Sequence, residues 1–154
     1  MAETPDDLYR RTLDVCMSSV FWTCRAAYPH LAESGRASVI NFASNAGTEG
    51  MAGNAVYAAA KEAIRGFSRS LAREWGRAGI RVNMIRPIAV SPGLAGWIEE
   101  NPKEAAAQAR AIPLGRFGDC ETDIAPVAVF LASDESAYLT AVTLPVGGGG
   151  GAER

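Results

Sequence analysis

Short β-branched apolar runs alternate with helical segments along this chain of 154 residues, and this alternation constrains the fold more than any other feature. Residues 37–42, 80–85 and 141–146 have the length and apolar content of buried strands. Strands separated by helices need crossover connections, which favour a parallel sheet. We therefore expect an α/β protein in which helices cover a doubly wound parallel sheet of about three strands.

Apolar residues at helical spacing and a high alanine content mark the segments between these strands. They predict helices over residues 5–31, 55–77, 97–111 and 121–132. The first helix is long and contains Ser18 and Ser19, so the pattern allows a kink or break there. The glycine tract 147–151 is interpreted as a flexible end.

Two segments rich in Gly, Pro, Ser or Asn follow the first two strands, residues 44–54 and 86–96, and are expected to be loops. In open parallel sheets, ligands bind beyond the carboxyl ends of the strands. We therefore expect functional residues in and next to these two segments.

The composition argues against several classes of function. Fifteen Lys and Arg against seventeen Asp and Glu give a net charge of -2, and without a basic block we expect neither nucleic acid nor a membrane as partner. The acidic start is unlike a secretory signal peptide. Because Cys16, Cys24 and Cys120 form no C-x-x-C pair and His30 is the only histidine, we expect no metal site and a reducing, cytoplasmic location.

Tyr57 and Lys61 lie four residues apart, so their side chains leave the same face of the second helix. A phenol, with an ordinary pKa of about 10, is a poor acid or base at neutral pH unless a cation favours its ionised form. Lys61 supplies a cation, and Ser44 adds a hydroxyl for a substrate oxygen. The three predict a proton-transfer site for a carbonyl or alcohol. The residues alone also allow a solvated lysine beside a packed tyrosine, and a Ser44 hydroxyl bonded to local backbone.

The chain resembles the catalytic segment of the short-chain dehydrogenase/reductase family in VINFASNAGTEGMAGNAVYAAAKEAIRGFSRSLAREW and the following GIRVNMIRP. The resemblance extends to LDVCMSSVFWTCRAAYPHL and to IPLGRFGDCETDIAPVAVFLASDESAYLTAVTLPVGGG, whose end is most like bacterial carrier-protein reductases. It implies a Rossmann-like fold. It also implies that Tyr57 is the general acid or base, that Lys61 assists Tyr57 and contacts the nicotinamide ribose, and that Ser44 orients the substrate oxygen.

The resemblance further implies that Pro87, Ile88 and Ser91 contact NAD or NADP together with Tyr57 and Lys61. The family usually has Pro-Gly at this position, so Ile88 places a β-branched side chain where close backbone approach is expected. Ser91 stands for a threonine that contacts the carboxamide.

Cys16 also departs from the family, which often has an asparagine there that is associated with a water relay to the lysine. The relay is proposed to use mainly the backbone carbonyl at this position. The alternative interpretation of Cys16 is a small buried hydrophobic residue.

The glycine-rich turn that binds a pyrophosphate in Rossmann folds has no counterpart before Tyr57. We therefore expect residues 1–154 to form one truncated or mis-started Rossmann-like domain. The family's preceding strand lies beside the one at 37–42, so we expect an unpaired hydrophobic edge there. The alternatives to truncation are that another polypeptide covers this edge or that the fold has rearranged.

The leading hypothesis is an NAD(P)-dependent oxidoreductase that interconverts a ketone and a secondary alcohol on a small-molecule substrate. The alternatives are a truncated, non-catalytic remnant that acts as an interaction partner or subunit, and a lyase or isomerase that uses the same acid-base group without a nucleotide. Helices 5–31 and 55–77 are expected to mediate self-association into a homodimer or homotetramer, because equivalent helices pair in the resembled family.

Overall fold

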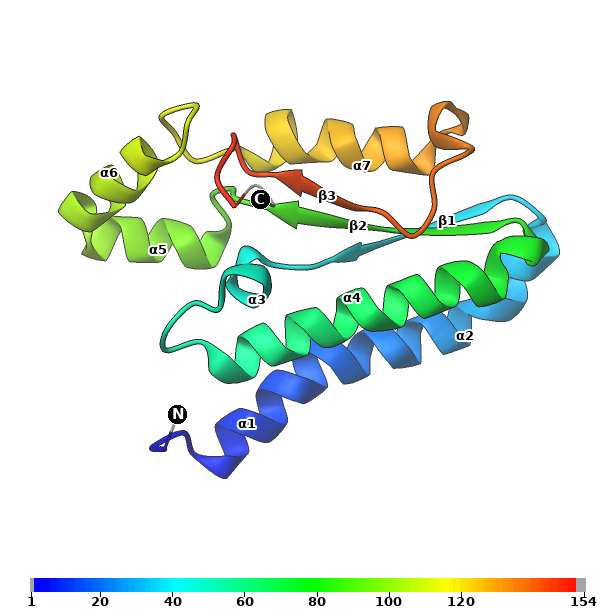
Figure 1. The fold of residues 1–154 in the computed structure, drawn as a ribbon, viewed down its shortest axis with the longest axis horizontal. Coiled ribbons are helices and arrows are strands. Elements are labelled where there is room, and N and C mark those ends of the chain that lie inside the picture. The colour runs from blue at the N-terminus through cyan, green and yellow to red at the C-terminus, as the bar shows by residue number, and fades with distance from the viewer. Residues whose placement is uncertain (1, 152–154) are drawn as a thin grey trace.

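The computed structural model describes residues 2–151, which form a parallel sheet with helices on both faces (Figure 1). The strand order is β1-β2-β3, and both neighbouring pairs are parallel. The strands are β1 (Ala37–Phe42), β2 (Ile80–Pro87) and β3 (Thr143–Val146). The expected α/β fold class is confirmed.

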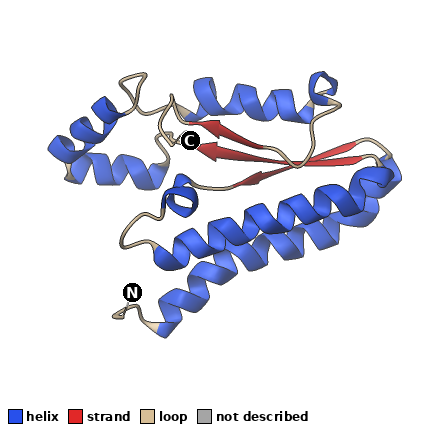
Figure 2. Cartoon of the chain, in the orientation of Figure 1, coloured by secondary structure: helices blue, strands red, loops and turns tan. Residues whose placement is uncertain are grey.

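Helices and short turns connect and cover the strands (Figure 2). The helices are α1 (Asp6–Leu13), α2 (Ser19–Ser34), α3 (Asn45–Glu49), α4 (Ala55–Trp75), α5 (Pro92–Glu100), α6 (Pro102–Ala111) and α7 (Ala125–Ala132). The π-helical turns are η1 (Asp14–Ser18) and η3 (Cys120–Ile124), and the 3-10 turns are η2 (Gly76–Ala78) and η4 (Asp134–Ser136). Within residues 2–151, no helix combines the length and the hydropathy that a membrane span requires.

The helix predicted over residues 5–31 changes to π geometry at η1, which ends at Ser18, where the sequence pattern allowed a kink or break. The prediction that residues 44–54 and 86–96 are loops was partly wrong, because both segments contain helical residues. Residues 44–54 contain α3, which begins after Ser44, and residues 86–96 contain the start of α5, which begins after Ser91. Each serine oxygen accepts a backbone N–H of the helix that follows, and this capping bond favours a helix start in an otherwise loop-like sequence.

Side chains of β2 alternate between the two faces of the sheet, as the pleat requires. Ile80 and Val82 pack with Leu71 in the layer of α2 and α4. Ile85 packs with Leu131 in the layer of α7. The alternation places an apolar core on each face and leaves the carboxyl ends of the strands free to carry polar groups.

The edge of β1 carries no further strand among residues 2–151. A cavity of about 340 Å³ lies between α2 and β1, and apolar side chains such as Val20, Val39 and Ile40 line it. The unpaired edge is therefore present in the described residues, but α2 and α7 leave most of its side chains half-buried.

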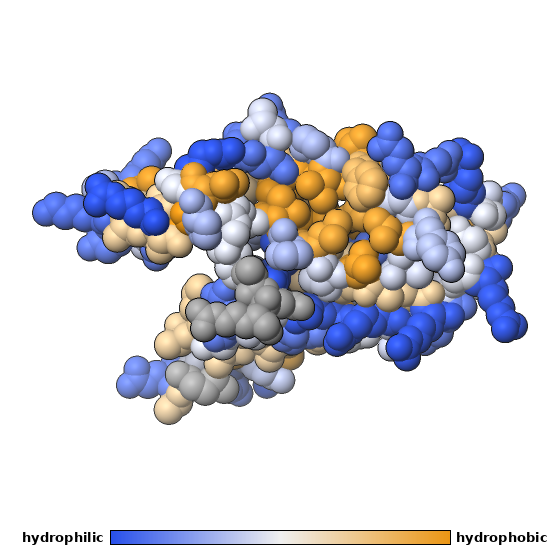
Figure 3. Space-filling model, turned by 45° about the horizontal axis from the view of Figure 1, so that its top comes forward, coloured by the Kyte–Doolittle hydropathy of each residue, from blue (hydrophilic) through white to orange (hydrophobic). Residues whose placement is uncertain are grey.

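The surface also carries exposed apolar side chains. Figure 3 shows hydrophobic residues gathered in the middle of one face, with hydrophilic residues around them. Leu114 and Val129 are 70% and 67% exposed, and α7, which carries Val129, is apolar along its whole length. A helix of this composition is usually buried, and exposed apolar patches mark interaction surfaces.

The glycine tract 147–151 is an ordered turn, so its interpretation as a flexible end was wrong. The carbonyl oxygen of Gly148 accepts the N–H of Leu114 at 3.0 Å. A Cβ atom on Gly150 would lie 2.9 Å from Cδ1 of Ile88, so the turn approaches its neighbours more closely than a side chain allows. The φ angles are +60°, +89° and +62° at Gly148, Gly149 and Gly151.

Candidate active site

The carboxyl end of β1 and the amino end of α4 bring together the residues expected to transfer a proton. Nζ of Lys61 donates a hydrogen bond to the carbonyl oxygen of Phe42 at 2.9 Å. The same Nζ lies 5.7 Å from the centroid of the Tyr57 ring. Ser44 follows Phe42 by two residues, at the point where the strand ends. A phenol, an ammonium group and a hydroxyl are therefore grouped at one strand end.

Lys61 is half-buried, and this burial lowers the pKa of its ammonium group. Nearby Cys16 acts on the Lys61 pKa in the opposite direction. Cys16 lies in the π-helical turn η1, which packs against α4. Such turns are often found at functional sites. The structure thus places Cys16 close to the candidate catalytic lysine, half-buried rather than enclosed in the core.

Ser44 caps α3, and its Oγ accepts the N–H of Ala46 at 3.2 Å. The local backbone bond that the sequence left open is therefore present. A serine hydroxyl has two acceptor sites and one donor. Within residues 2–151 the Ser44 hydroxyl donates to no acceptor, so its proton remains available for a substrate oxygen.

The second expected segment, Pro87 to Ser91, follows β2 at the same end of the sheet. Oγ of Ser91 accepts the N–H of Leu94 at 3.3 Å and begins α5. The side chain of Ile88 packs against the glycine turn, close to Gly150. The glycines thus accommodate the side chain by which this chain departs from the family pattern.

Arg86 is a charged residue at this end of the sheet that the sequence reasoning missed. It is only 1% exposed. Its Nη1 donates to Oγ1 of Thr48 at 2.6 Å, and its Nη2 donates to the carbonyl oxygen of Gly151. A cavity of about 980 Å³ lies beside it, lined also by Glu62 and Arg65. The available signal was its position directly after the strand predicted over residues 80–85, at the strand end where ligands of open sheets bind.

The described residues point to acid-base chemistry on an oxygen-containing group. Within residues 2–151, no cluster of three or more His, Cys, Asp or Glu side chains is placed to hold a metal ion. The phenol can exchange a proton with a bound carbonyl or alcohol, and the adjacent cation favours the phenolate form.

Comparisons with known proteins agree with this fold. The family model described as enoyl-(acyl carrier protein) reductase matches residues 1–150. The 12alpha-hydroxysteroid dehydrogenase of a Clostridium species is 44% identical over 133 residues, which cover 86% of this chain and 51% of that protein.

Solved structures of reductases and dehydrogenases have a similar fold. The 3-oxoacyl-[acyl-carrier protein] reductase of Brucella melitensis matches with a TM-score of 0.87 at 36% identity, over 97% of this chain and 55% of that one. The gluconate 5-dehydrogenase of Burkholderia cenocepacia, solved with NADP and tartrate, matches with a TM-score of 0.90 at 26% identity, over 96% of this chain and 58% of that one.

The fold and the site define an open α/β protein with a tyrosine and a lysine at the carboxyl end of a parallel strand. The chain belongs to the short-chain dehydrogenase/reductase family, a family of oxidoreductases. It spans about half the length of the curated relatives that it matches, 51% and 57% in two of them.

Proposed function

We propose that this chain carries the catalytic groups of an NAD(P)-dependent oxidoreductase that interconverts a ketone and a secondary alcohol. The observation that carries the proposal is the position of Lys61, which the carbonyl oxygen of Phe42 holds beside Tyr57. A free surface lysine would be solvated and mobile, whereas this one is fixed at the strand end where ligands of open sheets bind.

In the proposed reduction, the Tyr57 hydroxyl gives its proton to the substrate oxygen. The Lys61 cation stabilises the phenolate that remains, and its partial burial strengthens this effect because charges interact more strongly where water is excluded. Ser44 donates its hydroxyl hydrogen to the same substrate oxygen and fixes its position. In the reverse direction, the Tyr57 phenolate accepts the proton of the alcohol. The nicotinamide cofactor supplies or accepts the hydride.

The groups present suit the nicotinamide end of NAD or NADP. Tyr57 and Lys61 can donate hydrogen bonds to the nicotinamide ribose, and Pro87, Ile88 and Ser91 form the adjoining loop. The side chain of Ile88 packs against the glycine turn, so it does not extend freely from this loop. NADP is bound in the related gluconate 5-dehydrogenase. The described residues are compatible with either nucleotide.

Replacing Tyr57 by phenylalanine tests the proposal, because it removes only the hydroxyl. We expect Tyr57→Phe to lower turnover of a generic ketone with NADH or NADPH by at least about 10²-fold, as for loss of a general acid. Tyr138→Phe is the matched control, since Tyr138 is fully exposed at 103% and should keep its activity. Thermal unfolding of both variants should match the unmodified chain.

Equal turnover by Tyr57→Phe and Tyr138→Phe would contradict the catalytic role. A chain that folds but neither binds the cofactors nor turns over the ketone would instead favour a non-catalytic interaction partner.

We also propose that the chain self-associates through an aromatic surface on α2 and α4. Phe21 lies 4.9 Å from Trp22 and 6.0 Å from Phe67, measured between ring centroids. Tyr28 lies 4.9 Å from Trp75 on the same pair of helices. Trp22 is 52% exposed, and exposed aromatic clusters of this kind are typical of protein interfaces. A second copy of the chain is the proposed partner, in a homodimer or homotetramer.

A further inference from the structure

The loop from Ile88 to Ser91 is held at its middle by one distant residue, Gly118. The N–H of Gly118 donates to the carbonyl oxygen of Ile88 at 3.0 Å, and the carbonyl oxygen of Gly118 accepts the N–H of Val90 at 2.8 Å. The two bonds enclose Ala89, which forms a parallel bridge with Gly118. The conformation of this loop therefore depends on a segment about thirty residues further along the chain.

Gly118 is suited to this contact because it lacks a side chain. A Cβ atom at this position would lie 2.9 Å from the carbonyl oxygen of Ile88, which belongs to the backbone and cannot turn aside. Any other residue would push the loop away from segment 116–123.

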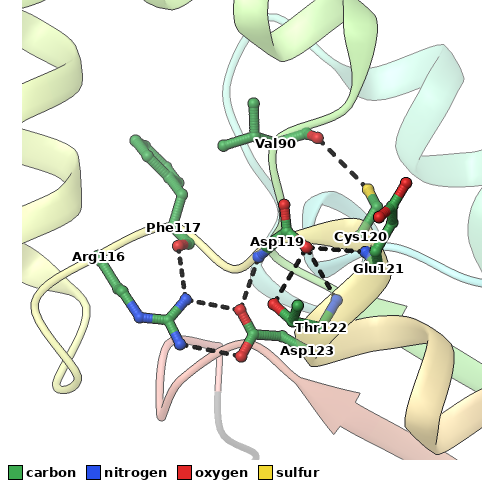
Figure 4. Close-up of polar contacts among 8 residues, drawn as sticks. All are labelled: Val90, Arg116, Phe117, Asp119, Cys120, Glu121, Thr122 and Asp123. Atoms are coloured by element: carbon green, nitrogen blue, oxygen red, sulfur yellow. Dashed lines mark hydrogen bonds and ion pairs between the residues drawn. The ribbon is translucent and has the colours of Figure 1, made fainter.

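Asp123 and its partner Arg116 bond to the backbone of Asp119 and Phe117 (Figure 4), the two residues that flank Gly118 in the sequence. Its carboxylate accepts two hydrogen bonds from the Arg116 guanidinium, at 2.6 and 2.9 Å, and one from the N–H of Asp119 at 2.7 Å. Nη1 of Arg116 also donates to the carbonyl oxygen of Phe117 at 3.1 Å. Such a bidentate pair has defined geometry as well as charge. The Arg116 guanidinium and the Asp119 N–H hold the pKa of Asp123 well below its usual range.

The π-helical turn η3 adds a direct contact with the loop. Oδ1 of Asp119 accepts the N–H groups of Glu121 and Thr122, at 2.9 and 2.8 Å, and so begins the turn. Sγ of Cys120 then donates to the carbonyl oxygen of Val90 at 3.3 Å. The turn, the ion pair and Gly118 thus act on the same short stretch of backbone.

We propose that Asp123 is a positioning residue for cofactor binding, which through Arg116 and Gly118 sets the backbone conformation of the loop from Ile88 to Ser91. This inference rests on the proposed function, which assigns that loop to the nicotinamide. Asp123 touches neither substrate nor cofactor in this scheme. It acts by keeping the loop in one conformation, so the cofactor does not have to order it on binding.

The first test measures amide exchange in the ligand-free chain, so it depends on no activity. We expect Asp123→Ala to accelerate exchange of the Val90 amide by roughly tenfold or more, because local opening becomes easier. The Met84 amide, bonded to Val142 O at 2.9 Å in the centre of β2, should be unchanged. Glu121→Gln is the matched control, because the Glu121 carboxylate is exposed and makes no hydrogen bond or ion pair within the described part of the chain.

The second test measures binding and turnover separately. In chemical-shift titrations with NADH and NADPH, Asp123→Ala should raise Kd by about tenfold, whereas kcat at saturation should change by less than about threefold. Arg116→Lys keeps the charge but loses the bidentate geometry, so it should give a smaller change of the same kind. Arg116→Lys also tests the inference if Asp123→Ala fails to fold.

Two results would overturn the inference: Val90 exchange equal to that of Glu121→Gln, or faster exchange with unchanged affinity for both nucleotides. Failure of the proposed function looks different. The unmodified chain would then bind neither nucleotide. In that case, Val90 exchange alone would decide whether Asp123 fixes the loop. Unchanged Val90 exchange in Asp123→Ala would again overturn the inference.

Discussion

Replacing Lys61 by methionine separates its part in catalysis from its part in stability. Methionine keeps an unbranched apolar side chain but lacks the ammonium group and its 2.9 Å bond to Phe42 O. A hydrogen bond to a charged group contributes about 1.5–3 kcal/mol, while burial of the charge costs a comparable amount. We therefore expect the free energy of unfolding at pH 7 to change by no more than about 1 kcal/mol. Turnover should fall by at least about 10²-fold, because Tyr57 loses its cation.

The lowered pKa of Lys61 also predicts how the stability difference between the unmodified chain and Lys61→Met changes with pH. Burial lowers the pKa of Lys61 in the folded chain, whereas in the unfolded chain it stays at its ordinary value of about 10.4. Between the two values the unfolded state binds more protons, so the Lys61 contribution to stability rises with pH. Lys61→Met lacks this contribution. The difference in unfolding free energy should therefore shift in favour of the unmodified chain as the pH rises toward about 10.

Urea unfolding at several pH values between 7 and about 10, together with a nicotinamide oxidation assay, measures both effects. Lys103→Met is the matched control, because Lys103 is an exposed lysine on α6. A Lys61→Met variant with full turnover, or with the same pH trend as Lys103→Met, would refute the reasoning about the buried ammonium group.

Three further predictions follow from the fold. Residues 92–111 should exchange amide hydrogens faster than α4, because α5 and α6 pack mainly on each other and Ala105 is their only buried residue within the described chain. Equally slow exchange in the two segments would contradict this prediction. Trp22→Glu should lower self-association in sedimentation at micromolar concentrations, whereas Tyr138→Glu should not; a chain that is monomeric without any substitution would disprove the proposed interface. Calorimetric titration should show weak binding of NADH and NADPH to the chain alone, because no glycine-rich pyrophosphate turn is found within residues 2–151; tight binding would contradict this.

Local sequence patterns were sufficient to predict the elements that carry the site. The strand over residues 37–42 has the expected bounds, and α4 ends two residues earlier than expected. Both depend on the spacing of apolar residues, which the printed sequence contains in full. The shared face of Tyr57 and Lys61 follows from the same helical period, so this pair was also predictable.

Capping and close packing changed the local predictions. Ser44 and Ser91 each begin a helix in a segment that composition assigned to a loop, because one side-chain hydrogen bond satisfies a helix start. The glycine tract has the composition of a flexible end. It forms an ordered turn because Ile88 and Pro113 pack against positions where no side chain fits.

Only the tertiary structure decided which groups meet at the site. Lys61 bonds to Phe42 across 19 positions of the sequence, and Arg86 bonds to Gly151 across 65. Asp123 fixes a loop that lies about thirty residues before it. A periodic pattern specifies which face of an element is buried, but the partner of each polar group depends on how the crossover connections stack one element on another. The sequence therefore determined which elements form and which side chains share a face, whereas packing in three dimensions determined where the buried charges and the loop contacts are placed.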